Sequence, residues 1–321
     1  MDRPPDANRS AAAPSRPPDS ASTPSPKRDT VLSTQVLKSV RTQPVPPRSE
    51  YKPVRSPGQI VFVVVGLVVA AWILALLADN KNIDYGLIVK NISNSMILKG
   101  LLKTFELTFV SMVIGTVLGV GIAIAKMSGN RVLTALAEFY IWFFRGVPLL
   151  VQIMIWGNFA LLFPRLGLGV PFTDVMLFSV PTNSAITVFT ASVLALSLHE
   201  AAYMAEVVRG GIQAVDSGQE EAAKAIGMTR RQILRRVVLP QALRTIIPPT
   251  GNQLISLLKA SAMVSVIAGG ELMTVANDIG SVSYKTLEML TVATFWYLVI
   301  VSVMTVLQRY LERRLAKGSR R

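Results

Sequence analysis

Residues 60–78 read IVFVVVGLVVAAWILALLA, nineteen residues without a charged side chain. As an α-helix this stretch would be about 28 Å long, close to the thickness of the hydrocarbon core of a bilayer. Lipid offers no hydrogen-bond partners to the backbone, so an apolar run of this length must satisfy its own N–H and C=O groups. The stretch therefore predicts a membrane-spanning helix.

Similar apolar segments recur along the rest of the chain. They cover residues 105–125, 136–163, 184–207, 245–269 and 290–307. With 51% hydrophobic residues and a mean hydropathy of +0.45, the 321-residue chain does not have the composition of a soluble globular protein. The fold class that we predict is an all-α polytopic membrane protein with about six transmembrane helices.

The basic residues are distributed unevenly between the two sides that six crossings would create. If the N-terminus is cytoplasmic, 25 of the 33 Lys and Arg residues lie on the cytoplasmic side. They fall in residues 1–59, 126–131, 209–244 and 309–321. This bias predicts that both termini are cytoplasmic. It also accounts for the net charge of +14 without nucleic acid as a partner, because basic loops are usual in membrane proteins.

The chain divides into three regions by composition. Residues 1–57 hold twelve of the nineteen prolines and predict a disordered cytoplasmic tail, because such a stretch cannot bury enough apolar surface to fold. Residues 58–80 predict an additional N-terminal transmembrane helix. Residues 95–315 hold the remaining membrane helices. Within the mixed external segment 79–103, the stretch from Ile88 to Leu102 has apolar spacing that suits an interfacial helix.

The segment 217–240 is polar and basic but lies between strongly apolar ones. It contains EAAKAIG at 221–227 and VVLP at 237–240. The Ala-rich start favours a helix that Gly227 ends, and Thr229 can cap a second helix, which Pro240 closes. A short cytoplasmic helix-turn-helix projecting from a membrane domain is suited to docking another protein.

This segment resembles the EAA loop of binding-protein-dependent ABC importers. The residues at the family's spacing are Glu221, Ala222, Ala223, Gly227, Leu239 and Pro240. Val237 stands where the family usually has Ile, a loss of one methylene. The resemblance implies that 217–240 is the coupling helix, which inserts into the ATP-binding cassette subunit.

Three further phrases narrow the resemblance to permeases for polar amino acids. They are FRGVPLLVQ at 144–152, YMAEVVRGGI at 203–212, and the run from LPQALR at 239–244 to NQLISLLK at 252–259. After Lys259 the family usually has Asp-Thr-Ser-Leu-Val-Ser, whereas this chain has the more apolar Ala260–Ser265. The resemblance covers about 95–315, which we take as the permease domain. It excludes the tail and the first helix, since the family core commonly has five helices.

The resemblance implies a subunit that forms the translocation path of an ATP-driven importer for polar amino acids. Its partners would be two ATP-binding cassette subunits inside, an extracytoplasmic solute-binding protein and a second permease subunit, identical or related. All would assemble in the bilayer of a prokaryotic plasma (inner) membrane. The chain has no Gly-Lys dipeptide and therefore no P-loop, so we expect a transport subunit rather than an enzyme. No cofactor is expected in this chain, because ATP-Mg would be bound by the partner.

Two charges inside predicted membrane helices are candidates for substrate contact. A zwitterionic amino acid presents a carboxylate that suits Arg145, and an ammonium that suits a carboxylate or a π face, such as Glu200 or Tyr203. Alternatively, Arg145 pairs permanently with Glu138 or Glu200 and holds two helices together. Lys259 is expected to pack at a helix break after the prolines at 248–249.

Other functions fit the sequence less well. The nearest is an importer for an amino-acid derivative such as an opine. An ATP-independent secondary transporter would need inverted repeats and intramembrane ion ligands. A membrane scaffold or regulatory protein would use the basic tail. Neither of the last two needs an EAA segment. The sequence does not tell which amino acid is carried, or whether the permeases pair as a homodimer or a heterodimer.

Overall fold

The computed structural model describes residues 57–169 and 176–317, and the chain divides into two units after Ala78. In the first unit, helix α2 (Pro57–Ala78) covers the stretch predicted as an additional membrane helix, with an uninterrupted apolar part at Ile60–Ile73. The predicted tail, 1–57, lies outside the described residues except for Pro57.

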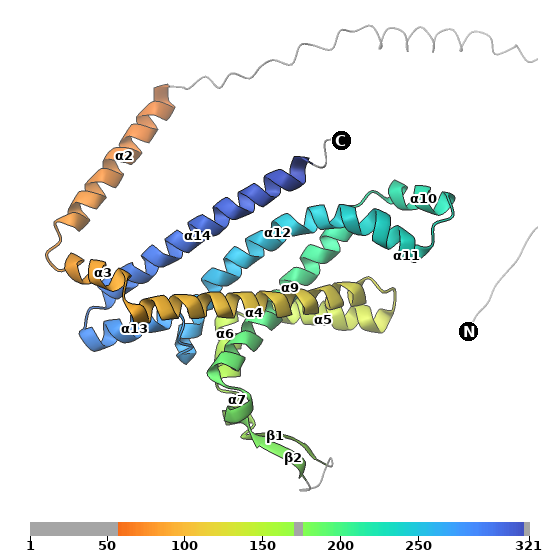
Figure 1. Cartoon of the computed structure of the whole chain (residues 1–321), viewed down its shortest axis with the longest axis horizontal. Coiled ribbons are helices and arrows are strands. Elements are labelled where there is room, and N and C mark those ends of the chain that lie inside the picture. The colour runs from red at the N-terminus through yellow and green to blue at the C-terminus, as the bar shows by residue number, and fades with distance from the viewer. Residues whose placement is uncertain (1–56, 170–175, 318–321) are drawn as a thin grey trace, which may run out of the picture. The chain divides into compact units, whose positions relative to one another are not determined.

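The second unit is helical apart from one β-hairpin (Figure 1). Its elements in chain order are α3 (Tyr85–Ile92), α4 (Ser95–Lys126), α5 (Arg131–Gly146), α6 (Leu149–Gly157), α7 (Phe159–Leu162), β1 (Arg165–Gly169), β2 (Met176–Pro181), α8 (Thr182–Ala185), α9 (Val188–Gln213), α10 (Ser217–Ala225), α11 (Arg230–Ile233), the π-helix η1 (Leu234–Val238), α12 (Leu239–Ala260), the 3₁₀ helix η2 (Ser261–Ile267), α13 (Leu272–Ser283) and α14 (Thr286–Lys317).

Each predicted apolar segment lies on a helix, although several of these helices are broken. Within the described residues, α4, α9 and α14 are each long and apolar enough to cross a membrane alone. Two bent pairs qualify as broken spans: α5 with α6, and the run from α11 to η2 with α13. The predicted class, a polytopic helical membrane protein, is confirmed. The hairpin is an addition that the all-helical prediction missed.

The segment 136–163, predicted as one membrane span in which Pro148 can break the helix, is covered by the end of α5, by α6 and by α7, and α5 and α6 are bent by 96° relative to each other. Pro148 has no N–H to continue the ladder of α5, and its ring disfavours helical geometry at Val147. The break leaves the carbonyls of Phe144 and Val147 without helical donors. The Gln152 side-chain nitrogen donates to both, at 3.0 and 2.9 Å.

The prediction of one interfacial helix from Ile88 to Leu102 is also wrong. Helix α3 ends at Ile92, and α4 begins at Ser95 behind an Asn94 cap, whose side chain accepts a hydrogen bond from the Met96 backbone N–H at 2.9 Å. Leu102 therefore lies inside a long membrane helix, and Ile88 is buried in a core cluster with α13 and α14. Asn94, the N-cap of α4, therefore starts a new helix two residues after α3 ends.

We predicted that Pro240 closes the second helix of the 217–240 segment, and this prediction is wrong. The chain continues through η1 into α12, and Pro240 lies in the first turn of that helix. The Leu239 N–H bonds to the carbonyl of Leu234, a π-type pairing that widens the helix where proline enters. The expected break after 248–249 is also absent, because α12 runs on to Ala260.

The actual break in this span lies beyond η2. Ala268 and Gly270 have left-handed backbone conformations, with φ of +56° and +73°. Glu271 then caps α13: its carboxylate accepts from the backbone N–H of Thr274 at 2.9 Å and from that of Met273. The reversal therefore depends on left-handed residues and a buried cap rather than on the prolines.

Helices α4 and α9 pack closely against each other in the core. A Cβ atom at Gly115 would lie 2.9 Å from Glu200 Cβ, and one at Gly119 would lie 2.7 Å from Met204 Cβ. Gly115 and Gly119 are four residues apart, the spacing that lets two membrane helices approach closely. Because no side chain larger than hydrogen fits at these two positions, the two glycines fix how α4 and α9 cross.

Candidate functional site

The segment 217–240 forms two short helices joined by a glycine turn. Asp216 caps α10 by accepting from the Gly218 N–H at 2.8 Å. Gly227 has φ of +79°, a conformation that favours glycine, and ends the first helix. Thr229 caps α11 in a reciprocal box with Gln232, whose side-chain oxygen accepts the Thr229 N–H at 2.8 Å. The predicted helix-turn-helix is present, with the caps that the sequence indicated.

The residues predicted for coupling separate into one that supports the fold and five that face outward. Ala223 is buried in a small cluster with Ile233 and Val238, which holds the two helices together. The others are exposed: Glu221, Ala222, Gly227, Leu239 and Pro240. The surface they form is therefore available to a partner, while Ala223 sets its shape.

Two exposed apolar side chains on this segment were missed by sequence reasoning. Ile226 is 78% exposed and Leu234 is 51% exposed. Both lie in a polar and basic segment, and an apolar residue in such a segment was the signal that could have indicated an exposed docking residue. Elsewhere on the same segment, Arg231, Gln232, Arg235 and Arg236 line a basic hollow of about 370 Å³. Apolar anchors with a charged rim are typical of protein–protein interfaces.

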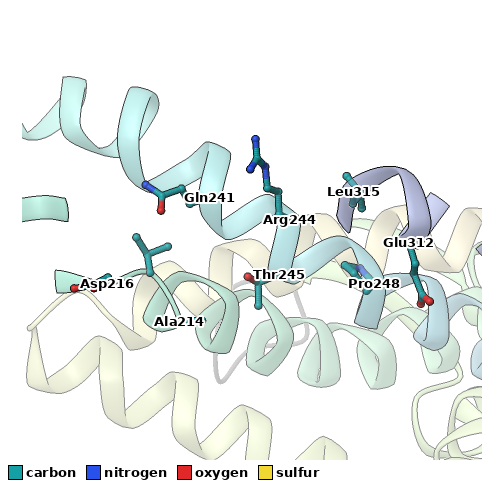
Figure 2. A pocket seen from close by; sticks show the side chains of 9 residues that line it. Ala214, Asp216, Gln241, Arg244, Thr245, Pro248, Glu312 and Leu315 are labelled. Atoms are coloured by element: carbon teal, nitrogen blue, oxygen red, sulfur yellow. The ribbon is translucent and has the colours of Figure 1, made fainter. Parts of the chain in front are cut away.

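A larger cavity of about 630 Å³ lies where the segment joins the membrane helices (Figure 2). Its lining comes from the end of α9 and the residues after it, the start of α12 and the end of α14: Ala214, Val215, Asp216, Gln241, Arg244, Thr245, Pro248, Glu312 and Leu315. Gln308 of α14 donates to Glu312 at 2.9 Å and to the Pro248 carbonyl at 3.4 Å. The Gln308 side chain thus connects α14 to α12, the helix that follows the 217–240 segment.

A three-residue charge network lies on α9 ahead of the segment. Glu206 accepts from Lys126, the last residue of α4, at 2.9 Å, and from the Arg209 guanidinium at 2.6 and 3.0 Å. All three side chains are 21–29% exposed. The network ties the end of α4 to α9 only a few residues before α10 begins.

Arg145 lies in the last turn of α5, beside the break at Pro148, and its side chain is exposed. The guanidinium carbon is 5.1 Å from the centre of the Tyr203 ring, within cation–π range. Among the described residues Arg145 makes no ion pair, so the permanent pair with Glu138 or Glu200 is absent here. The structure brings together two of the three predicted substrate residues.

Glu200 lies differently, because it is only 3% exposed. Its Cβ and Cγ pack where a Gly115 side chain would stand, and its carboxylate interacts with the Gln253 side chain of α12. The other carboxyl oxygen is buried without a hydrogen-bond partner. Glu200 therefore lies in the contact between α9, α4 and α12, and its second oxygen is available to a further donor.

Gln152 and His199 are further polar groups near this site. In the sequence, Gln152 stood out only as part of the motif at 144–152. In the structure, its side chain donates to both carbonyls freed at the α5–α6 break. His199 Nδ1 is 3.3 Å from the Gln152 side-chain nitrogen, and its ring centre is 5.0 Å from that of Tyr203. A glutamine four residues after a proline inside an apolar run was the available signal.

Known proteins match the chain over most of the second unit. Residues 115–317 match the family described as "Binding-protein-dependent transport system inner membrane component". The arginine transport system permease protein ArgU of Corynebacterium glutamicum is 42% identical, over 85% of this chain and 84% of the relative. The arginine transport system permease protein ArtQ of Bacillus subtilis is 37% identical, over 73% of this chain and 98% of the relative.

Solved structures agree with these sequence relatives. A crystal structure of an amino acid ABC transporter with histidines matches with a TM-score of 0.62 and 38% identity, over 72% of this chain and 99% of that one. The MetNI methionine ABC transporter, at 22% identity and a TM-score of 0.55, shows the same fold.

These matches decide between the classes that the sequence left open. They confirm the resemblance to amino-acid importer permeases and the expectation of a transport subunit rather than an enzyme. A secondary transporter and a membrane scaffold are set aside, because the matched proteins are components of binding-protein-dependent systems. The chain belongs to the family of binding-protein-dependent transport system inner membrane components.

Proposed function

We propose that this chain forms the translocation path of an ATP-driven importer for a polar amino acid, with cationic amino acids as the first candidates. The two arginine permeases among its relatives support this choice. A relative from Rickettsia bellii, named "Putative glutamine transport system permease protein GlnP", is 36% identical over 68% of this chain. Amino acids with neutral side chains are therefore the second candidates. An amino-acid derivative such as an opine remains the alternative substrate.

The observation that carries the proposal is the exposed helix-turn-helix at 217–240. We assign it to docking in the ATP-binding cassette subunit. Ile226 and Leu234 are the apolar anchors, and Glu221, Ala222 and Gly227 are exposed on the same segment. ATP-driven closure of the ATPases would move this segment, and α9 and α12, which enter and leave it, would transmit the movement.

Membership of the family supports the following assembly. Two permease subunits pair, two ATPases bind on the cytoplasmic side and a solute-binding protein docks outside. Both termini are cytoplasmic and the membrane is the prokaryotic inner membrane. ATP-Mg binds to the ATPase, and this chain holds no cofactor of its own. The excess of basic residues on the 217–240 side supports the orientation.

Substrate contact is assigned to the cluster beside the α5–α6 break. Arg145 is exposed, so its guanidinium can meet the carboxylate of the zwitterion, and the Tyr203 ring beside it offers a π face for the ammonium. Glu200 lies outside this cluster, in the buried contact between α9, α4 and α12, and its unpartnered carboxyl oxygen is assigned to an ammonium or a cationic side chain.

Uptake in cells that lack the gene, with and without the gene restored, tests the function. We expect ATP-dependent uptake of radiolabelled arginine on restoration, competed by unlabelled arginine more strongly than by glutamine or octopine. Stronger competition by octopine would move the assignment to the opine alternative. Restoration of no amino-acid uptake, with the protein present in the membrane, would contradict the proposal.

A further inference from the structure

The last turns of α14 extend beyond the part of the helix that can lie in hydrocarbon. With 32 residues, α14 is about 48 Å long, whereas the hydrocarbon core of a bilayer is about 30 Å thick. The apolar stretch of this helix, 290–307, accounts for about 27 Å of that length. The residues from Gln308 onward therefore lie at the level of the headgroups or beyond it.

One side of this extension faces α12. Gln308 donates to the Pro248 carbonyl of α12 at 3.4 Å, and Glu312 and Leu315 line the cavity that α12 shares with α14 (Figure 2). The spacing of four and three residues places Gln308, Glu312 and Leu315 on one side of the helix. This side is already used by contacts within the chain.

The opposite side of the extension is basic and exposed. It carries Arg309, Arg313 and Arg314, which we call the α14 cluster. At about 100° per residue, these three positions lie between about 100° and 240° around the helix from Gln308. Among the described residues none of the three forms an ion pair, and Arg314 lies over the exposed Tyr310 ring at 4.6 Å. Three unneutralised cations within two turns favour an anion from outside the chain.

The cluster continues the side of α14 that is exposed within the membrane. Val303, Val306 and Leu307 are 55%, 64% and 62% exposed, and their helical positions fall in the same sector as the cluster. The exposed side therefore changes from apolar to basic where the hydrocarbon gives way to headgroups. Tyr310 lies at this level too, and tyrosine is enriched at membrane–water interfaces.

We propose that the α14 cluster binds the phosphate of an anionic phospholipid headgroup in the cytoplasmic leaflet. This inference goes beyond the proposed function and uses only its orientation, in which the C-terminus is cytoplasmic. Guanidinium groups bind phosphate through paired hydrogen bonds, and basic clusters immediately after a membrane helix attract anionic lipids. Because Gln308 connects the same turns to α12, the bound lipid would hold the end of α14 against the helix that follows the 217–240 segment.

Two protein partners fit the α14 cluster less well. The ATPase is assigned to the 217–240 segment, and the cluster points away from α12, the helix that follows this segment. A second copy that docked by the same side would bring arginines against arginines, which is unfavourable. A lipid headgroup matches both the charge of the cluster and its depth.

Lipid binding by the purified complex of permease and ATPase tests the proposal. The complex in detergent is titrated with phosphatidylglycerol or with zwitterionic phosphatidylcholine, and native mass spectrometry counts the lipids bound to the permease. One variant replaces the whole α14 cluster by glutamine, a second replaces it by lysine, and a third is Arg313→Gln alone. The matched control carries Arg231→Gln, Arg235→Gln and Arg236→Gln, which remove the same charge from the hollow on 217–240.

We expect phosphatidylglycerol to bind more tightly than phosphatidylcholine. Its affinity should fall about tenfold to a hundredfold in the glutamine variant of the cluster and about fivefold in Arg313→Gln, which keeps two cations to hold the orientation. The lysine variant and the control at the hollow should stay within about threefold of the wild type, since both keep the charge at the α14 cluster.

Wild-type affinity in Arg313→Gln and in the glutamine variant would overturn the inference. An equal loss in the control would overturn it as well, because net charge rather than a site would then attract the lipid. Displacement by inorganic phosphate at equal ionic strength would assign a free-anion site instead. Loss of the ATPase from the glutamine variant with unchanged lipid binding would assign the cluster to the ATPase. Uptake is measured separately, so the importer function and the lipid site can fail independently.

Discussion

At the scale of single residues, the two charges proposed for substrate contact lie in different surroundings. Arg145 is exposed and stacked on Tyr203, whereas Glu200 is buried between α9, α4 and α12. Helical spacing placed Glu200 and Tyr203 near one another, but it could not tell which neighbouring helix covers each side chain. The packing of Glu200 on Gly115 depends on the crossing of α4 and α9, which no local pattern encodes.

Arg145→Gln should weaken substrate recognition without lowering the amount of protein in the membrane. The lost charge-assisted contact is worth about 1.5–3 kcal/mol, which corresponds to a roughly ten- to hundred-fold fall in apparent affinity. Abundance should hold, because an exposed guanidinium with no ion pair leaves no charge stranded. Uptake kinetics and membrane abundance are measured together, and Arg145→Lys serves as the variant that retains the charge.

The same experiment distinguishes a structural pair. If Arg145 and Glu200 held two helices together, each single Gln substitution would lower abundance, and the double substitution would partly restore it. That pattern, with unchanged apparent affinity in the remaining protein, would contradict substrate contact. We expect the Glu200→Gln substitution to affect cationic substrates most, since a neutral amide keeps the hydrogen bond and loses the charge.

At the scale of elements, the contact between α4 and α9 is the most sensitive to side-chain size. Gly119→Ala would place a methyl 2.7 Å from Met204 Cβ and 2.9 Å from the Ala201 carbonyl oxygen. Because backbone must move, we expect a loss of about 1–3 kcal/mol of stability. Thermal unfolding of the purified protein in detergent should show a lower midpoint.

Gly121→Ala is the matched control on the same helix. No atom lies within 4 Å of a Cβ at that position. The substitution should therefore leave the midpoint unchanged or raise it slightly, since alanine favours the helix by up to about 1 kcal/mol over glycine. Equal destabilisation by both substitutions would mean that helix–helix contact does not explain the sensitivity of Gly119.

The sequence predicted where the helices lie better than where they break. Long apolar runs located α4, α9 and α14, and Gly227 and Thr229 located α10 and α11, because these signals are local. No predicted apolar run covered α13, which forms the second half of a broken span. The effect of a proline depends on its surroundings. Pro148 breaks its helix because Gln152 is present to bond the freed carbonyls, whereas Pro240 is accommodated by a π turn. The hairpin has strands of only five and six residues, too short to stand out from the apolar pattern.

At the scale of the whole molecule, the matches to known permeases differ in how far they reach toward the N-terminus. The Corynebacterium glutamicum relative matches 273 residues, which is more than the second unit contains, so that match extends into the first unit. The family match begins at residue 115, and the Bacillus subtilis relative is covered almost completely by 73% of this chain.

Deletion of residues 2–50 should leave uptake nearly unchanged at equal membrane abundance. The deleted stretch is rich in proline and poor in apolar residues, so no packed structure is lost. Lys52 and Arg55 remain beside the first membrane helix to hold its orientation. A large loss of transport, with the protein still in the membrane, would assign the tail a function.

The central claim is that 217–240 couples this chain to an ATPase, and Gly227→Asp tests it most directly. Nothing lies within 4 Å of a Cβ at Gly227, and aspartate tolerates its left-handed conformation, so insertion and folding should survive. The added charge would stand beside Ile226, inside the proposed docking surface. Gly227→Asn, similar in shape but neutral, is the control.

The measurement is ATP-dependent uptake per unit of protein in the membrane, together with retention of the ATPase on the purified permease. The account predicts that Gly227→Asp abolishes both uptake and ATPase retention while abundance stays normal, and that Gly227→Asn keeps a substantial part of each. Normal ATP-dependent uptake by Gly227→Asp would contradict the assignment of 217–240 as the coupling segment.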